Sequence, residues 1–300
     1  MTARVSCVGV AVLDFIYYVE SLPTSDGKIV AHSLKESGGG MAANAASAIS
    51  RLGGLSSWFG RVGQDAMGET VLSGLSAEGV NVDLVREVPD IQTSHSIILV
   101  DGNGDRAVIL YGSESMPADS AWLDIAAVTK SDAVLADIRW IEGAIKALNA
   151  SRISGKPAVL DADISTHPQA ISAVQAASHA VFSAPGLAKL FETDDPREGL
   201  KRAITCAPFV AVTLGANGVM WLDRHGTVQT IPALPVVARE TLGAGDVFHG
   251  AFSLALAERR SEQESLKFAA AAAAIKCARS GGRSSYPNRK EVDQCLAQIF

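Results

Sequence analysis

Cysteine is scarce in this chain of 300 residues, and no two of its four cysteines form a Cys-x-x-Cys pair. His-x-x-x-His spacing is also missing, so the sequence offers neither a disulfide framework nor a structural zinc site. We therefore expect the four to be buried small apolar side chains in a protein of the reducing cytoplasm. They are Cys7, Cys206, Cys277 and Cys295.

Long apolar runs and an excess of positive charge are missing as well. No window reaches the roughly 20 apolar residues that a membrane span needs, and the first apolar run is too short for a signal peptide with a cleavage site. The chain has 26 basic and 32 acidic residues, for a net charge of -6. This balance argues against general nucleic-acid binding, which relies on Lys and Arg contacts to phosphate.

Three familiar motifs of enzymes are absent. There is no Gly-x-x-x-x-Gly-Lys-Ser/Thr, so a Walker-type phosphate loop is excluded. No Gly-x-Gly-x-x-Gly follows the first apolar run "RVSCVGVAV", which argues against a nicotinamide-dependent oxidoreductase. Gly-x-Ser-x-Gly is missing too, which argues against a hydrolase with a nucleophile elbow.

What the chain does contain is an alternation of strand-like and helical segments. Hydrophobic residues make up 48% of it, and from about residue 132 apolar runs of strand length alternate with helices of ten or so residues. This pattern predicts a parallel sheet wound by crossover helices. We expect one α/β domain over residues 1–300, with a small β lid formed by about 14–37 and 93–112.

The stretch "LGAGDVFHGAF" places glycines directly before a long apolar helix. The first turn of a helix leaves backbone N–H groups unpaired, and glycines let a ligand approach them, so the turn suits an anion. Asp246 at its edge makes sense as a base that deprotonates a hydroxyl attacking a phosphoryl group. The alternative is that Asp246 is a plain helix cap.

Two further glycine-rich turns stand out. In "ESGGGMAANAAS", the amides of Gly39 and Gly40 and the side chain of Asn44 suit the hydroxyls of a polyol, and the alternative is a packed glycine turn. "TLGANG", at 213–218, follows an apolar strand and has the form of a nucleotide-contacting turn, although such turns are common.

These pieces, in this order, resemble the ribokinase-like (PfkB) family of carbohydrate kinases over essentially the whole chain. The matching segments are "GGG-x-A-x-N-x-A", "GRVGQDAMG", "TLGANG" and, above all, "TLGAGDVFHGAF". The resemblance implies a Rossmann-like three-layer α/β/α core with a mostly parallel sheet and a small β lid. It also implies ATP as phosphoryl donor, Mg²⁺ at the phosphates and a sugar hydroxyl as acceptor.

The resemblance also implies roles for individual residues. Asp246 is the catalytic base, and the anion hole for the transferred phosphoryl group is formed by the amides of Gly243, Ala244 and Gly245. Sugar hydroxyls are held by Asp14, Gly39, Gly40 and Asn44. The nucleotide is lined by Thr213, Gly215 and Gly218.

Two positions depart from the family pattern. Where the family has an Asn-x-x-Glu motif that organises magnesium, this chain has Ser183 and Gly186, so no metal ligands are assigned. Where the family has Asp-Thr, near its site for a monovalent cation, this chain has Glu240-Thr241, which leaves a requirement for K⁺ open.

Within the family the chain most resembles the sulfofructose kinase branch, in segments such as "VLADIRW", "FSAPGLAKL" and "KCARSGGR". That branch phosphorylates the C1 hydroxyl of a ketohexose with a C6 sulfonate, and Lys28 and Arg139 match its sulfonate-contacting positions. The alternative is that both are solvent-facing charges, or that Arg139 pairs with Asp137 or Glu142. Leu110 stands where the branch has a polar Asn, which weakens the assignment.

Other functions remain open at this point. They are phosphorylation of a neutral ketose, ribose, 2-keto-3-deoxygluconate or a sugar phosphate, and binding of sugar or nucleotide without turnover. The segment from Phe15 to Tyr18 reads as an exposed apolar part of the lid, so we expect a homodimer formed through the lid.

Overall fold

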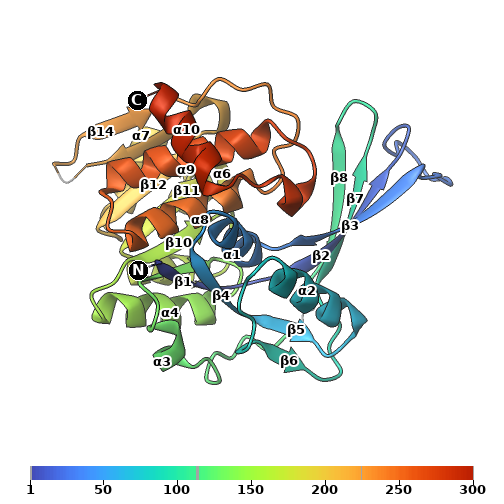
Figure 1. Ribbon diagram of the computed structural model, residues 1–300, viewed down its shortest axis with the longest axis horizontal. Coiled ribbons are helices and arrows are strands. Elements are labelled where there is room, and N and C mark those ends of the chain that lie inside the picture. The colour runs from blue at the N-terminus through green and yellow to red at the C-terminus, as the bar shows by residue number, and fades with distance from the viewer. Residues whose placement is uncertain (1, 113–114, 224, 300) are drawn as a thin grey trace.

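The central element of the structure, a computed structural model that describes residues 2–112, 115–223 and 225–299, is an eight-stranded sheet (Figure 1). Its strand order is β14-β13-β12-β11-β10-β9-β1-β4. The strands are β1 (Arg4–Val8), β4 (Leu55–Phe59), β9 (Ala133–Asp137), β10 (Ala158–Ala162), β11 (His179–Ser183), β12 (Phe209–Thr213), β13 (Val219–Leu222) and β14 (Val228–Ile231). All neighbours pair in parallel except β12 with β13 and β13 with β14.

The strands of this sheet are apolar on both faces, as the near-continuous runs predicted. Along β10, for example, Val159 belongs to one hydrophobic core while Ala158 and Leu160 belong to a second core on the opposite face. Side chains alternate between faces along a strand, so each strand contributes to both cores. Helices must therefore cover both faces.

Two groups of helices do so. One core is closed by α1 (Met41–Arg51), α8 (Ala244–Ala257), α9 (Glu262–Cys277) and α10 (Arg289–Ile299). The other is closed by α4 (Ile141–Ile153), α5 (Ala170–Ala176), α6 (Ala184–Phe191) and α7 (Pro196–Ala203), with the short α3 (Ile125–Val128) beside α4. The predicted three-layer α/β/α core with a mostly parallel sheet is confirmed.

The first strand is shorter than the run "RVSCVGVAV" predicted, because the chain changes sheets after Val8. The carboxylate of Asp137 lies at this point and accepts a hydrogen bond from the Val10 amide at 2.8 Å. A Cβ on Gly9 would lie only 2.0 Å from the same carboxylate. The chain leaves the large sheet at Gly9 and enters β2 (Val12–Tyr18) in a second sheet.

This second sheet has four strands in the order β3-β2-β7-β8 and extends away from the core on the right of Figure 1. Its other strands are β3 (Ser33–Gly39), β7 (His95–Val100) and β8 (Arg106–Tyr111). The other described elements are β5 (Arg61–Gly63), paired with β6 (Arg86–Val88), α2 (Ala66–Ala77), and two short 3-10 helices, η1 (Gly215–Asn217) and η2 (Gly282–Ser285).

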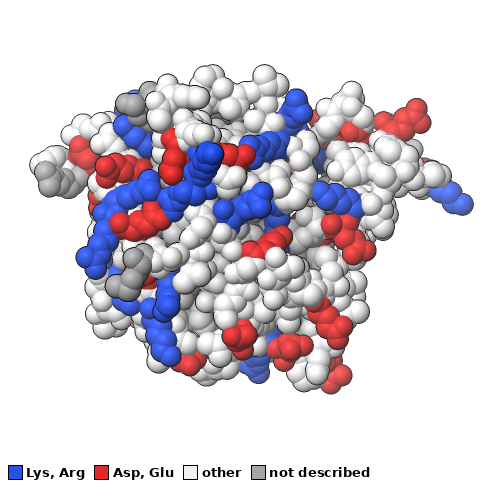
Figure 2. Space-filling model, in the orientation of Figure 1, with Lys and Arg blue, Asp and Glu red and all other residues white. Residues whose placement is uncertain are grey.

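The exposed apolar surface of this second sheet lies on a different strand from the predicted one. On β2, Ile16 is buried and its aromatic neighbours are half-buried, so the prediction for Phe15–Tyr18 is wrong. The edge strand β8 is exposed instead, with Ile109 and Leu110 63% and 64% accessible. In Figure 2 much of the projecting sheet is uncharged, whereas basic and acidic side chains are interspersed over the core.

The cysteines are free, but only Cys7 is buried; the prediction that all four are buried is wrong for the other three, which lie partly exposed at helices or in a loop. Within the described ranges, the structure contains no helix that is both long enough and apolar enough to cross a membrane.

Candidate active site

The start of α8 has the geometry of an anion cradle. Gly243 precedes the helix with a left-handed φ of 77°, a conformation that favours glycine. In the described chain, the amides of Gly243 and Gly245 have no backbone acceptor, while the amide of Ala244 donates to the Thr241 carbonyl at 3.2 Å. A Cβ on Gly245 would meet no atom within 4 Å. The turn therefore presents open backbone donors at a helix N-terminus.

Asp246 does not cap this helix. No side-chain cap hydrogen bond is present at the start of α8 in the described structure. Instead, the carboxylate of Asp246 accepts a hydrogen bond from the Asn44 side-chain amide at 2.6 Å. No described hydrogen bond joins the Asp246 side chain to the backbone of α8, and the structure brings together two residues that the sequence analysis singled out separately.

Close packing of α1 against α8 makes this contact possible. A Cβ on Gly250 of α8 would lie 2.6 Å from the Ala45 carbonyl oxygen of α1, so the helices approach to a distance that only glycine permits. The small residues of "MAANAAS" allow the same approach from the α1 side. Asn44 is thereby placed against Asp246.

Burial raises the pKa of Asp246 to about 6. The hydrogen bond from Asn44 and the charge of Arg283 act in the opposite direction, and the carboxylate of Asp137 adds to the increase. A carboxylate with this pKa is ionised at neutral pH and is more basic than an ordinary Asp. It therefore has the properties of a general base.

Arg283, to which the sequence analysis gave no role, completes this arrangement. Its guanidinium is nearly buried and donates to the Asn44 side-chain oxygen at 2.8 Å and to the Gly39 carbonyl at 3.1 Å. It also forms an ion pair with Glu78 at 3.5 Å. By holding the oxygen of Asn44, Arg283 directs the amide nitrogen of Asn44 toward Asp246.

Asp14 lies at the same corner of the molecule, on β2. It is buried and accepts a hydrogen bond from the Ser96 hydroxyl at 2.5 Å, and burial raises its pKa. Gly39 is required beside it, because a Cβ there would lie 2.3 Å from the Asp14 carboxylate. Gly40 starts α1 with a φ of 92°, which also favours glycine. Asp14, Gly39 and Asn44 are thus linked through mutual contacts and Arg283.

The 213–218 turn and the start of α8 open into one cavity of about 620 Å³. Thr213, Gly215 and Gly218 line it together with Ala244 and Gly245. The lining that the sequence analysis missed comes mainly from α8, α9 and the segment 233–238, and includes Leu234, Pro235, Phe248, Ala270, Ala273, Ala274 and Cys277. The alanines of α9 leave room for a flat apolar group such as a purine.

Lys28 and Arg139, which were predicted to contact the anionic group of the sugar, have fewer contacts with the site. Lys28 is exposed in the connection between β2 and β3, and no described contact joins it to the site. The Arg139 guanidinium forms an ion pair with Asp163 at 2.9 Å, whereas only its backbone amide contacts Asp137. The suggested pairing of its guanidinium with Asp137 or Glu142 is therefore wrong. Leu110 is exposed on β8.

Ser183 and Gly186 have a structural role in place of the missing Asn-x-x-Glu. The Ser183 hydroxyl caps α6 by accepting from the Gly186 amide at 3.0 Å, and it donates to Asp163 at 2.8 Å. Among the described residues there is no group of three or more His, Cys, Asp or Glu that could hold a metal ion.

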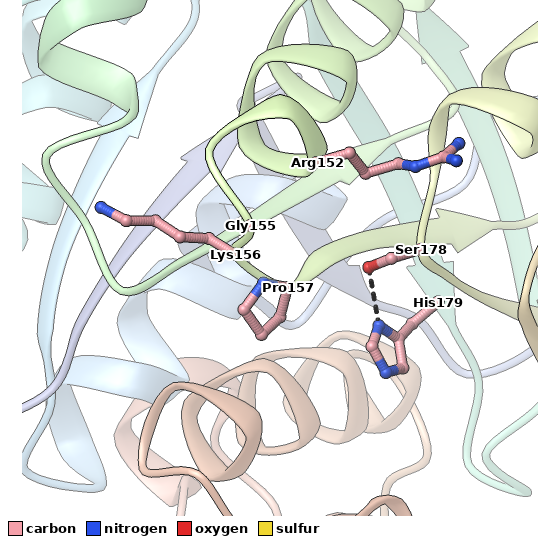
Figure 3. Close-up of a pocket in the computed structure, with 6 residues that line it drawn as sticks. All are labelled: Arg152, Gly155, Lys156, Pro157, Ser178 and His179. Carbon is pink, nitrogen blue, oxygen red and sulfur yellow. Dashed lines mark hydrogen bonds between the residues drawn. The ribbon is translucent and has the colours of Figure 1, made fainter.

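A second cavity, of about 360 Å³, lies at the opposite ends of the strands, where β10 and β11 begin (Figure 3). Ser178 and His179 form a hydrogen bond there at 2.8 Å, and burial lowers the pKa of His179 to about 4. Lys156 donates to the carbonyls of Thr129 and Ser131 at 2.6 Å each. We assign no chemistry to this cavity, since its lysine is engaged and its histidine is neutral.

Comparisons with known proteins agree with this geometry. The profile of the pfkB family carbohydrate kinases matches residues 2–289. A ribokinase from Schizosaccharomyces pombe is 30% identical over 85% of this chain and 85% of its own length. A ribokinase from Arabidopsis thaliana is 29% identical over 96% of this chain and 80% of its own length.

Solved structures give the same result. A candidate ribokinase from Agrobacterium tumefaciens superposes with a TM-score of 0.95 at 34% identity, covering 99% of this chain and 98% of that chain. Arabidopsis thaliana ribokinase in complex with ribose and ATP superposes with a TM-score of 0.87 at 26% identity, covering 99% of both chains. The chain therefore belongs to the pfkB family of carbohydrate kinases and is an ATP-dependent sugar kinase.

Proposed function

We propose that the protein transfers the γ-phosphoryl group of ATP to a hydroxyl of a small sugar, with Asp246 as the catalytic base. One observation carries the proposal: the Asp246 carboxylate, whose pKa burial raises to about 6, stands at the start of α8, where Ala244 and Gly245 line the same cavity as the 213–218 turn and the Gly245 amide has no described backbone acceptor. In this proposal the base and the anion hole stand next to the donor site.

In this proposal, Asn44 donates to one carboxylate oxygen of Asp246, and the other oxygen accepts the proton of the sugar hydroxyl. The hydroxyl oxygen then forms a bond to the γ-phosphorus while the bond from that phosphorus to ADP breaks. Negative charge on the transferred group is stabilised by the amides of Gly243 and Gly245, which have no described backbone acceptor, and by the amide of Ala244 once it leaves the Thr241 carbonyl. The products are a sugar phosphate, ADP and one proton.

Thr213, Gly215 and Gly218 line the nucleotide in this proposal, with the base of ATP against the alanines of α9. When bound with ATP, Mg²⁺ would neutralise phosphate charge. The described residues contain no group of three or more His, Cys, Asp or Glu that could hold it, and we assign no residue to it.

Asp14, Gly39, Gly40 and Asn44 would hold the sugar hydroxyls. Asn44 contacts the carboxylate of Asp246, Arg283 links Asn44 to the Gly39 carbonyl, and Gly39 packs against Asp14. Our lead substrate is a ketohexose with an anionic group, such as 6-deoxy-6-sulfofructose, phosphorylated at its C1 hydroxyl. Arg139 supports this choice, because it follows β9 at the edge of the sheet that carries the site. A sulfonate would then compete with Asp163 for its guanidinium.

Ribose is the second candidate, because the relatives and superposed structures reported above carry the name ribokinase. The exposed Leu110 offers no polar group to a sulfonate, which also favours a neutral sugar.

The two substrates are separated by measuring kcat/KM for 6-deoxy-6-sulfofructose, fructose and ribose. If Lys28 and Arg139 bind the anionic group of the sugar, each alanine variant should lower kcat/KM for sulfofructose about tenfold or more. The kcat/KM for fructose should stay within about threefold of the wild type. Lys201→Ala, at an exposed lysine on α7, is the matched control. Equal losses on both sugars, or a preference of the wild type for ribose, would contradict the anionic substrate.

We also propose that residues 1–300 act as one kinase domain in which the four-stranded sheet serves as a lid over the sugar site. A second copy of the chain is proposed to cover the exposed apolar edge strand β8, where Val108, Ile109 and Leu110 are 58–64% accessible. Light scattering tests the homodimer. Ile109→Lys should give a monomer, and a wild-type monomer would contradict the proposal.

A further inference from the structure

Lys276, near the C-terminal end of α9, is the most completely buried cation described in the structure, with 0% of its surface accessible. Its ammonium lies 2.7 Å from one carboxylate oxygen of Glu240 and 3.4 Å from the backbone carbonyl of the same residue. An ammonium is costly to bury unless it is paired, so the pair must be tightly formed in the folded chain.

Glu240 has further partners that fix its position. The amides of Gly281 and Gly282 donate to its carboxylate at 3.0 Å and 3.2 Å. Burial alone would raise the pKa of Glu240, but these donors and Lys276 hold it below its usual value. Its own amide and that of Arg239 donate to the Cys277 carbonyl, at 3.2 Å and 2.7 Å respectively.

Glu240 stands three residues before Gly243, at the start of the turn that leads into α8. The turn is therefore fastened at one end to α9 and to the segment after it. That segment also carries Arg283, which orients Asn44 toward Asp246. Lys276 therefore lies between two sets of contacts. One holds the turn that leads to the α8 amides, and the other orients Asn44 toward Asp246; Lys276 contacts neither these amides nor Asp246.

The residues at Glu240 do not fit a monovalent cation. The carboxylate already accepts one ammonium and two backbone amides. A second cation bound to it would stand close to the Lys276 ammonium, which is itself fully buried, so repulsion between the two like charges would oppose binding.

We propose that Lys276 is a positioning residue whose ammonium, supplied from within the chain, orders the turn 240–243 before α8, so that the enzyme needs no monovalent cation. This inference rests on the proposed role of the α8 amides in phosphoryl transfer. The inference goes further than that role, because it makes the position of the α8 amides depend on Lys276, a side chain that contacts neither substrate.

The first test uses the wild-type protein without substrate. Melting temperature and hydrogen exchange of the amides in 240–247 are measured in potassium, sodium, ammonium and N-methyl-D-glucamine chlorides at one ionic strength. Both should be the same in all four salts. Stabilisation by potassium alone would overturn the proposal, and the result needs neither a folded variant nor a known sugar.

The second test uses Lys276→Met, Glu240→Gln and the variant with both changes, with Lys201→Met as control. Lys276→Met should lower kcat by about tenfold to a hundredfold, leave the KM values for sugar and ATP within about threefold, and speed exchange in 240–247. The double variant keeps a neutral pair in the same volume, so it should fold and show the same loss of kcat. The control should match the wild type.

A third measurement separates positioning from a merely structural role. Lys276→Ala leaves space for a small cation, so ammonium or potassium should restore part of its kcat and slow its exchange in 240–247, while N-methyl-D-glucamine should not. Unchanged kcat and unchanged exchange in both Lys276→Met and the double variant would overturn the proposal. If no sugar is phosphorylated by the wild type, the proposed function fails, but the exchange and melting data still decide whether Lys276 orders the turn.

Discussion

Replacing Asp246 by Asn removes the proposed base while keeping its shape. The new side chain retains an oxygen that can accept the hydrogen bond that Asn44 now donates at 2.6 Å, so the contact between α1 and α8 should survive. A general base contributes about 10²–10⁴ to a rate, and we expect kcat to fall by about that factor. Affinity for ATP should change by less than about threefold, because the nucleotide cavity is untouched.

The pKa of about 6 gives the same experiment a second readout. At pH 7.5 the ionised form of the base outweighs the protonated form by roughly 30 to 1, so the wild-type rate is near its plateau. As pH falls through 6 the carboxylate takes up a proton, and wild-type kcat/KM should fall about tenfold per pH unit. The residual activity of Asp246→Asn should lack this acidic limb.

The assay is release of ADP measured with a panel of sugars from pH 5 to pH 8, with ATP binding followed separately by calorimetry. Ser183→Ala, which removes a cap of α6, serves as a control for general disturbance at the same edge of the sheet. A variant Asp246→Asn with wild-type kcat, or with an unchanged acidic limb, would refute the role of Asp246 as base.

Three other changes test neighbouring parts of the site. Arg283→Met removes a positive charge that lowers the pKa of Asp246, so the acidic limb of the pH profile should move to higher pH; an unmoved limb would contradict the coupling. Ala274→Leu fills the nucleotide cavity and should raise the KM for ATP about tenfold without changing sugar binding; an unchanged KM would place ATP elsewhere. Gly243→Ala forces alanine into a left-handed φ with its Cβ 3.1 Å from the Tyr286 hydroxyl, so kcat should drop about tenfold or more while ATP still binds; full activity would show that this turn is not needed.

The parts of the site that could be predicted from sequence depend on local backbone geometry. Gly243 and Gly40 each precede a long helix and can be recognised from the sequence, because a glycine at a helix start indicates a positive φ. Both adopt a positive φ in the structure. The strands of the parallel sheet were equally readable, because burial on both faces leaves continuous apolar runs.

The parts that were missed depend on contacts between distant segments. Arg283 is 239 residues from the Asn44 that it orients, and no local pattern distinguishes it from a surface arginine. Ala270, Ala273 and Ala274 of α9 line the cavity of about 620 Å³, but their small side chains give no local signal of a binding role. Lys276 follows them on α9, and its pairing with Glu240, 36 residues away in another segment, has no local sequence signal.

The central claim is that the amides at the start of α8 hold the phosphoryl group while Asp246 accepts the proton of the attacking hydroxyl. The most direct measurement is a crystal structure with ADP, aluminium fluoride and the sugar that the enzyme phosphorylates. We predict that the fluoride group lies about 2.7–3.1 Å from the amides of Gly243, Ala244 and Gly245, with a sugar hydroxyl between it and Asp246. Aluminium fluoride bound away from this turn, or a sugar whose hydroxyls do not reach Asp246, would contradict the claim.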